Sequence, residues 1–186
     1  MAITKIQSES LNLADTYAFT GTVTGTPTGL NNAHLWYYTS TTTVGTSDVK
    51  LTNWSAHNGS EIGSIGTDMT HSSGNFTFPS TGIWLIQARI GYYITGSSEA
   101  RFIYSNIRSS TNSGSSYTLV DEAVSNIANV DSGSNDLGTT FNQYILDVTD
   151  ASTQRIAIYA ASASTIGQIE TYNKATNLLF TRLGDT

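Results

Sequence analysis

The chain has 186 residues, of which 38% are hydrophobic and only 12% are charged, and its formal net charge is −6 at pH 7. The acidic balance argues against electrostatic binding to nucleic acid or to an anionic membrane, and the absence of cysteine excludes disulfides and thiolate chemistry. The 29 Thr, 24 Ser and 16 Gly residues favour pleated strands and turns, so the composition predicts an all-β protein.

The first 32 residues are predicted to form an extended N-terminal attachment arm and linker. In "SLNLADTYAFTGTVTG" the large apolar residues recur at odd positions, namely Leu11, Leu13, Tyr17, Phe19 and Val23. This period of two predicts a strand with one apolar face, and a lone strand is not stable in water. We therefore expect the arm to lie on the domain, on a neighbouring subunit or on a larger assembly. A disordered tail is the alternative, which the regularly spaced apolar residues disfavour.

The start of the chain shows no targeting or membrane signal. "MAITKIQSES" has no apolar core of the signal-peptide type, and no apolar run approaches the roughly 18 residues of a membrane span. We expect the protein to stay where it is made, or to be assembled there, without inserting into a membrane.

Residues 33–186 are predicted to form a jelly-roll or similar β-sandwich domain. Short strand-like stretches alternate with loops of Ser, Gly and Asn, and they lie at 33–39, 47–54, 75–79, 83–94, 100–108, 116–124, 139–148, 154–163 and 177–183. Many short strands at this spacing are typical of a sandwich or jelly roll. The stretch 116–124 also fits helical spacing, so a helix is the alternative there.

The stretch 83–94 predicts a central strand that is covered differently on its two faces. Its even positions form one continuous apolar face: Trp84, Ile86, Ala88, Ile90, Tyr92 and Ile94. We expect this face to lie in the core. The odd positions begin with Ile83 and Leu85 and then become polar, so we expect that apolar pair to be covered by a neighbouring subunit. Before this strand, Pro79 should end one strand, and Gly82 should allow a tight turn.

The same region resembles the jelly-roll superfamily of complement-q and tumour-necrosis-factor proteins. "FTFPSTGIWLIQA" is similar to that superfamily's F-x-x-P-x-x-G-x-Y segment, with Phe76, Pro79 and Gly82 matching and Trp84 at the aromatic position. "NLLFTRLG" resembles its last strand, although Thr181 replaces the usual small Gly. "YILDVTDASTQRIAIYA" resembles its hairpin before that strand. The resemblance implies a jelly roll that assembles as a homotrimer.

The resemblance also implies which residues line the subunit contact. In the superfamily, the two long strands before the last one face the threefold axis. We therefore expect Tyr144, Ala157 and Tyr159 to join Ile83 and Leu85 at the interface, with Ile156 and Ile158 in the core. Tyr159 is the strongest single axis candidate.

The N-terminal residues "ITKIQSESLNLADTYAFTGTVTG" closely resemble a leader found on virion structural and tail-fibre proteins of bacteriophages, especially marine ones. In those proteins a jelly roll of this superfamily follows the leader. The resemblance implies a trimeric surface fibre or capsid-decoration protein, located on the virion surface and assembled in the host cytoplasm. Its partners would be its own copies and, through the arm, other virion proteins.

No set of residues points to catalysis or to a cofactor. The histidines do not have metal-ligand spacing, and neither a G-x-S-x-G nucleophile motif nor a phosphate-binding glycine loop occurs. We expect the protein not to be an enzyme. The loop "DSGSND" offers oxygens from Asp131, Asn135 and Asp136, which makes it a weak calcium candidate. A solvated turn is the favoured interpretation, because no Glu follows at EF-hand spacing.

Three other functions stay open at this stage. A receptor-binding module could recognise host surface glycan, and the aromatic residues Trp36, Tyr37 and Tyr38 could stack on sugars, although core packing is favoured for them. A soluble signalling-type ligand is disfavoured by the missing signal peptide, cysteines and collagen repeat. An enzyme is the weakest alternative.

The arm interpretation predicts the behaviour of a truncated chain. A protein starting at Asn31 should fold and trimerise, because the jelly roll contains its own core, but it should not be incorporated into virions. Sedimentation and immunoblotting of purified virions would measure the two properties. Normal incorporation of the truncated protein would contradict the interpretation, as would loss of its folded trimer.

Overall fold

The computed structural model of the chain describes residues 30–57, 64–94, 100–128, 136–163 and 167–186. The arm residues Leu11, Leu13, Tyr17, Phe19 and Val23 lie outside this part, as do Asp131 and Asn135 of the calcium candidate. The elements are β1 (Ala33–Tyr38), β2 (Thr43–Val44), β3 (Val49–Lys50), β4 (Trp54–Ala56), β5 (Thr70–Ser72), β6 (Asn75–Thr77), β7 (Gly82–Ile94), β8 (Ala100–Ser110), β9 (Thr118–Ile127), β10 (Asp136–Val148), β11 (Arg155–Ser162), β12 (Gly167–Ile169), the 3-10 turn η2 (Tyr172–Lys174) and β13 (Asn177–Gly184).

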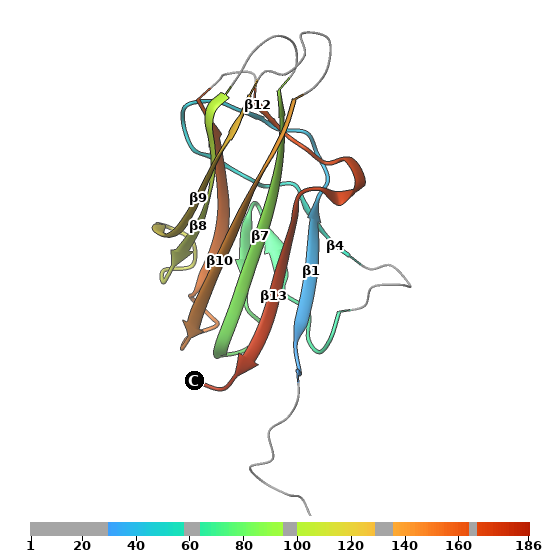
Figure 1. Cartoon of the computed structure of the whole chain (residues 1–186). Coiled ribbons are helices and arrows are strands. Elements are labelled where there is room, and N and C mark those ends of the chain that lie inside the picture. Colours follow the sequence, from blue (N-terminus) through green and yellow to red (C-terminus); the bar gives the residue numbers. More distant parts are fainter. Residues whose placement is uncertain (1–29, 58–63, 95–99, 129–135, 164–166) are drawn as a thin grey trace, which may run out of the picture.

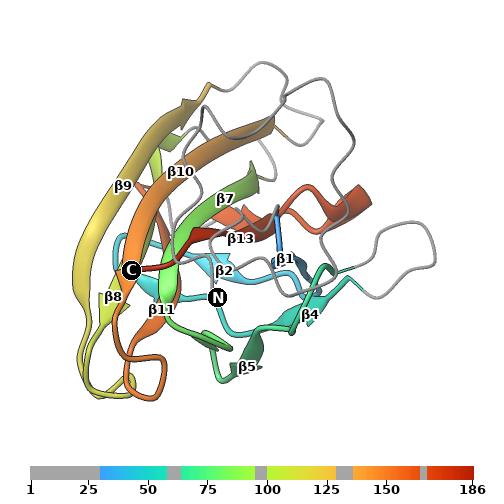
Figure 2. The same ribbon diagram turned by 90° about the horizontal axis from the view of Figure 1, so that it is seen from below.

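The described residues form two antiparallel sheets, of seven and six strands, as the all-β jelly-roll prediction requires (Figure 1). The first sheet has the order β2-β12-β7-β13-β1-β4, with β10 on the other side of β7. The second has the order β5-β6-β11-β8-β9, with β3 also paired to β11. Seen end-on, β10, β7, β13 and β1 follow one another across one side of the sandwich (Figure 2). Within each sheet most neighbouring strands are not consecutive in sequence, which is the arrangement of a jelly roll.

The first and last strands of the described chain pair with each other. β1 pairs antiparallel with β13, and Ala33 lies opposite Thr181. The jelly roll therefore begins and ends at the same end of the sandwich (Figure 1). The first strand begins at Ala33, the residue from which the sequence predicts the jelly-roll domain.

The central strand β7 confirms the predicted alternation. All six even positions from Trp84 to Ile94 are fully buried, and Ile83 and Leu85 on the odd face are half-buried. β10 runs along the whole length of β7, from Asp136 opposite Ile94 to Val148 opposite Gly82. On its other side β7 pairs with β13 and then with β12. A strand with neighbours on both sides and an apolar inner face becomes the centre of the sheet.

An aromatic cluster joins the two sheets in the core. The ring of Phe76 on β6 lies 5.3 Å from that of Trp36 on β1 and 5.1 Å from that of Phe180 on β13. Trp36 and Tyr38 are buried, so core packing is confirmed for these two aromatic residues. Tyr37 points outward instead, with the Lys174 ammonium 5.2 Å from its ring centre.

The corner before β7 is built as predicted. β6 ends at Thr77, two residues before Pro79, and Gly82 has a φ of +136°. A Cβ at Gly82 would lie 2.5 Å from Arg182 Nε and 2.6 Å from the carbonyl oxygen of Gly184. Both the backbone conformation and the close approach of β13 therefore require glycine here.

Several local predictions are corrected. Residues 118–124 of the stretch 116–124 lie in the strand β9, so the helical alternative is wrong. The single strand predicted at 47–54 is interrupted and contributes to both β3 and β4. The sequence missed β2, β5 and β12, each of two or three residues. Strands this short carry too few residues to show a period, and only their pairing partners make them strands. η2 is the one helical element among the described residues, and none there could cross a membrane.

Two histidines accept backbone hydrogen bonds in their neutral form. Nδ1 of His34 accepts from the amide of Met69 at 3.0 Å, and Nε2 of His71 accepts from the amide of Gly74 at 3.0 Å. Burial lowers the pKa of His34, which the nearby Asp68 carboxylate opposes. Burial also lowers the pKa of His71, and the charge of Lys50 lowers it further. Both imidazoles are therefore held neutral in the folded protein.

This arrangement predicts a loss of stability in acid. Histidine in the unfolded chain has an ordinary pKa of 6.5. Below that pH the two histidines bind protons in the unfolded chain, whereas in the folded chain they stay neutral until the pH falls further. The stabilisation that comes from the two neutral imidazoles should be complete above about pH 6.5. The free energy of unfolding should then decrease as the pH falls towards the lowered pKa values of the two histidines in the folded protein. Urea unfolding at a series of pH values measures this effect. The double variant His34→Gln, His71→Gln should show a shallower decrease between pH 7.5 and 5, and an unchanged slope would contradict the assignment.

Candidate functional site

The outward side of the first sheet carries large apolar residues. The register places the odd positions of β10 beside the odd positions of β7, on the side away from the core. In the single subunit Phe141 is 54% exposed, Ile145 is 57% exposed and Leu137 is 67% exposed. Soluble proteins rarely leave several large apolar side chains together in water, so this side is a candidate contact surface.

The apolar surface continues across β13 to β1. Leu179 lies beside Gln87 of β7 and opposite Leu35 of β1, and both leucines are half-buried. We use the name apolar face for the outward residues that these four neighbouring strands bring together: Leu35, Ile83, Leu85, Phe141, Ile145 and Leu179. Residues from four segments widely separated in sequence therefore share one side of the sandwich.

Polar residues of β7 interrupt the apolar face at two successive outward positions. Gln87 of β7 lies directly opposite Gln143 of β10, and Arg89 lies opposite Phe141. Arg89 Nε donates to the carbonyl of Ala175 at 3.0 Å, and Nη2 donates to that of Lys174 at 3.2 Å. The guanidinium is thus fixed at the end of η2, where carbonyl groups favour a cation. Beyond these two positions lie Leu137 and Tyr93, a pair that also faces outward.

A buried polar cluster lies on the inward side of β10. Thr140 and Asn142, at even positions, are buried between the sheets. The Ser105 hydroxyl of β8 donates to Asn142 Oδ1 and shares a hydrogen bond of 2.5 Å with the Thr140 hydroxyl. Asn142 Nδ2 donates to the Ser105 carbonyl at 3.1 Å and to Asp121 Oδ2 of β9 at 2.7 Å. These bonds replace the water that the polar groups lose on burial.

Tyr92 completes the polar cluster. Its hydroxyl donates to the carbonyl of Tyr104 at 2.7 Å. Burial raises the pKa of Tyr92 far above the ordinary value, which the hydroxyl groups of Thr140 and Ser105 oppose. The phenol therefore stays a neutral hydrogen-bond donor inside the sandwich.

The five residues predicted for the subunit interface do not lie on one surface of the structure. Ile83 and Leu85 belong to the apolar face. Tyr144 lies opposite Ile86 and packs against the core, so it points inward. Ala157 and Tyr159 lie on β11, in the second sheet. Ala157 has no exposed surface, so it offers nothing to a neighbouring subunit.

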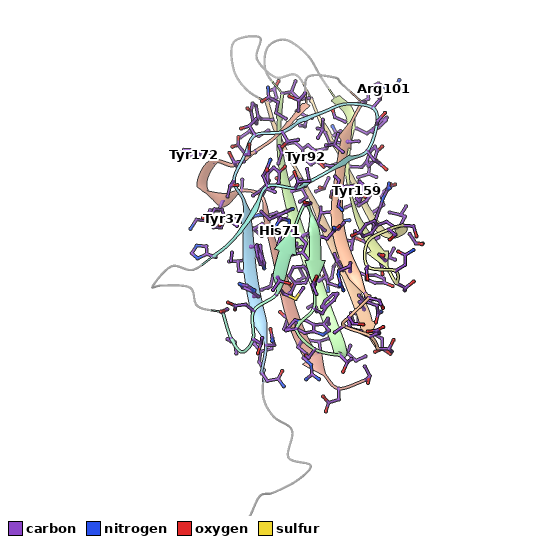
Figure 3. All side chains as sticks on the ribbon, turned by 180° about the vertical axis from the view of Figure 1, so that it is seen from behind. Tyr37, His71, Tyr92, Arg101, Tyr159 and Tyr172 are labelled. Atoms are coloured by element: carbon purple, nitrogen blue, oxygen red, sulfur yellow. The ribbon has the colours of Figure 1, made fainter. Side chains whose placement is uncertain are left out.

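Tyr159 is occupied by contacts within its own subunit. The Arg108 guanidinium lies 4.3 Å from the centre of its ring, and the Tyr117 ring lies 6.2 Å away. Arg108 also forms an ion pair with Asp48. Figure 3 shows Tyr159 together with His71 on the side of the second sheet. The role of Tyr159 as the leading axis residue is therefore not supported by its surroundings.

The sequence analysis did not select the outward residues Leu137 and Phe141, and of the adjacent pair it selected Tyr144, which points inward, whereas Ile145 points outward. The apolar pattern of β10 changes along the strand: Leu137 and Phe141 stand at odd positions, whereas Leu146 and Val148 stand at even positions. Alternation alone therefore does not select one side of this strand for the core. Only the register with β7, whose inner face is unambiguous, places the even positions of β10 inside.

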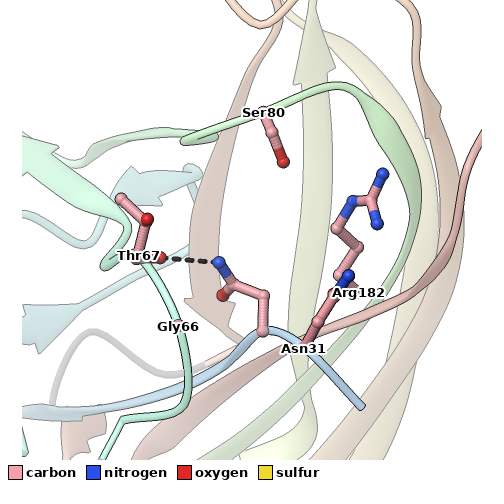
Figure 4. A pocket seen from close by; sticks show the side chains of 6 residues that line it. Asn31, Gly66, Thr67, Ser80 and Arg182 are labelled. Atoms are coloured by element: carbon pink, nitrogen blue, oxygen red, sulfur yellow. Dashed lines mark hydrogen bonds between the residues drawn. The ribbon is translucent and has the colours of Figure 1, made fainter. Parts of the chain in front are cut away.

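Two other places were candidate sites: the calcium candidate around Asp136 and a polar cavity. Asp136 begins β10 and is buried, and no group of three or more metal-binding side chains occurs among the described residues. A polar cavity of about 240 Å³ lies where the described chain begins, beside the end of β13. Its lining includes Asn32, whose Nδ2 donates to the Thr67 carbonyl at 2.7 Å, and Arg182 (Figure 4). Arg182 is bonded to Thr81 and Asp185. Nothing in this lining forms a nucleophile and base pair.

Comparison with known proteins shows the fold. Neither a protein-family profile nor a curated protein sequence matches this chain. Among solved structures, murine APRIL at pH 5.0 aligns with a TM-score of 0.58 and 8% identity, over 82% of this chain and 98% of that chain. Eiger TNF from S. frugiperda aligns with a TM-score of 0.58 and 13% identity, over 83% of this chain and 93% of that chain. The chain therefore has a jelly-roll fold of the tumour-necrosis-factor-like type.

The polar cluster generates a prediction about stability. Asn142→Ala should lower the free energy of unfolding by about 2 kcal/mol, because Ser105 and Asp121 would lose partners inside the sandwich. The matched control is Gln143→Ala, the exposed neighbour, which should cost under about 0.5 kcal/mol. Urea unfolding followed by circular dichroism measures both values. Equal effects of the two substitutions would contradict the role of the cluster.

Proposed function

We propose that this chain is a structural, non-enzymatic protein that assembles as a homotrimer through the apolar face. The observation that carries the proposal is the exposure of Ile145, which lies opposite Leu85, and of Phe141 on the same sheet surface. An obligate interface of this kind buries on the order of 2,000 Å² or more and resembles a divided protein core. Three copies, rather than two, are implied by the resemblance to the complement-q and tumour-necrosis-factor superfamily.

The assembly in which the trimer works is proposed from the N-terminal residues. Their resemblance to the leader of bacteriophage virion proteins supports a surface fibre or capsid-decoration protein that the arm attaches to the virion. Strand addition to another virion protein would satisfy the backbone of the arm, and three arms per trimer would act together. The protein would be assembled in the host cytoplasm and displayed on the virion surface.

The position of the chain ends fits this proposal. The described chain enters the jelly roll beside the end of β13, so an arm can leave from one end of the sandwich. The opposite end then points away from the attachment point. A fibre or decoration protein needs this separation between its anchored end and its displayed end.

One charged substitution tests the proposed interface. Ile145→Glu would place three carboxylates in a contact that excludes water, so the variant should sediment as a monomer while its circular dichroism stays unchanged. The matched control is Val124→Glu on β9, because Val124 is 61% exposed and lies in the second sheet. The control should remain a trimer. Sedimentation at micromolar concentration distinguishes the outcomes.

Two results would contradict two different parts of the proposal, namely the trimer and the contact surface. A monomeric parent protein would refute trimerisation itself. A trimeric Ile145→Glu variant would instead show that the apolar face is not the contact surface. Imaging of virions with an antibody to this protein separately tests the virion assignment.

A receptor-binding module is the second candidate, and one observation favours it. The rings of Phe102 and Tyr104 stack at 5.9 Å with an interplanar angle of 28°, and Phe102 remains exposed. Exposed aromatic faces are suited to stacking on sugars. Binding to a panel of bacterial surface glycans, compared with binding by Phe102→Ala, tests this function. Equal binding by both proteins would exclude these rings.

A further inference from the structure

A cluster of three polar side chains lies on the second sheet, outside the apolar face. Lys50 ends β3 and pairs with Tyr159 of β11, Asn75 begins β6, and Tyr117 precedes β9. The Tyr117 hydroxyl donates to Asn75 Oδ1 at 2.5 Å, and Lys50 Nζ contacts the same oxygen. The fold thus brings an amine, a carboxamide and a phenol together from three separate segments.

The position of Lys50 is closely determined by its neighbours. Its ammonium nitrogen lies 4.8 Å from the centre of the Tyr117 ring. Its carbon stem crosses Gly74, where a Cβ would lie 2.9 Å from Lys50 Cε. Gly74 also has a φ of +78°, a conformation that glycine adopts without strain. The lysine therefore approaches Asn75 along a path that a side chain at residue 74 would close.

The environment favours the nucleophilic form of the amine. Among the ion pairs of the described residues, none involves Lys50, so no carboxylate there compensates its charge. Burial lowers the pKa of Lys50. A larger share of the side chain is then the free amine, which is the form that attacks a carbonyl carbon.

The carboxamide of Asn75 is polarised at its oxygen. The phenol of Tyr117 is held as a proton donor, because burial raises the pKa of Tyr117 to about 12, with the neighbouring Tyr159 adding to the increase and Arg155 opposing it. A donor placed on a carbonyl oxygen stabilises the negative charge that develops there during attack on the carbon. Tyr117 can therefore stabilise the addition intermediate at Asn75.

We propose that Lys50 and Asn75 become joined by an amide bond between Nζ and Cγ. The free amine adds to Cγ, the Cγ–Nδ2 bond breaks, and Nδ2 leaves as ammonia with a proton that Nζ gives up. One amine and one primary amide yield one secondary amide and one ammonia, so no oxidant, reductant or cofactor takes part. The bond makes residues 50–75 a covalently closed loop. It crosslinks β3 to β6 in a protein that has no cysteine and therefore no disulfide.

Intact mass spectrometry of the purified, denatured full chain tests the proposal directly. The mass should lie about 17 Da below the value calculated from the sequence, which is the mass of ammonia. Lys50→Met and Asn75→Ala should each show their full calculated masses. The matched control, Lys174→Met, should keep the deficit, because the Lys174 ammonium contacts His57 rather than a carboxamide.

Peptide mapping distinguishes the bond from other losses of ammonia. Cleavage before aspartate releases residues 48–67 and 68–120 as separate peptides from an unlinked chain and as one branched species from a linked chain. A full calculated mass for the parent protein would overturn the proposal, as would a deficit with the two peptides separate. Tyr117→Phe should slow the appearance of the deficit in freshly folded protein by about a hundredfold, and an unchanged rate would remove Tyr117 from the reaction.

Discussion

The pairing of β7 on both of its edges is the constraint on which the rest of the fold depends. Its even positions are apolar without interruption, so only one of its faces can enter the core. Ala88 of that face lies between Asn142 of β10 and Leu178 of β13. Because successive side chains alternate between faces, this register determines the inward side of both neighbours, and a slip of one residue would reverse it.

β10 shows the consequence of that constraint. In the first half of β10 the large apolar residues stand at odd positions, yet the register with β7 places Thr140 and Asn142 inward and Phe141 and Ile145 outward. The inward polar groups are satisfied by Ser105 and Asp121. The outward apolar groups have no comparable partner in the described part of a single subunit. A neighbouring subunit on the apolar face would supply it, so the fold and the proposed assembly have the same physical origin.

The outward sides of the two sheets differ in how they are covered. On the second sheet, the Arg108 guanidinium and the Tyr117 ring cover Tyr159, and Lys50 lies against Asn75. These contacts come from the subunit itself and include hydrogen bonds and cation–π interactions. On the first sheet, Phe141 and Ile145 remain exposed, and the exposed apolar residues of the second sheet, such as Phe102 and Val124, lie on β8 and β9. The proposed interface and the proposed internal amide bond therefore use opposite sides of the sandwich, and each can be tested without disturbing the other.

The sequence by itself determined the all-β class, most of the long strands, the core face of β7 and the corner at Pro79 and Gly82. These features depend on composition, on a period of two and on residues with restricted backbone conformations, all of which are local. The tertiary structure alone decided the short strands β2, β5 and β12, the inward side of β10, and the burial of Ala157. The reason is that either the odd or the even positions of a strand can face the core. Only the register with a neighbouring strand of known orientation decides which positions do so. In β10 the two halves of the strand carry opposite patterns, because Leu137 and Phe141 favour the odd positions and Leu146 and Val148 favour the even ones. Only the register with β7 decides that the even positions, Tyr144 among them, face the core and that Ile145 faces outward.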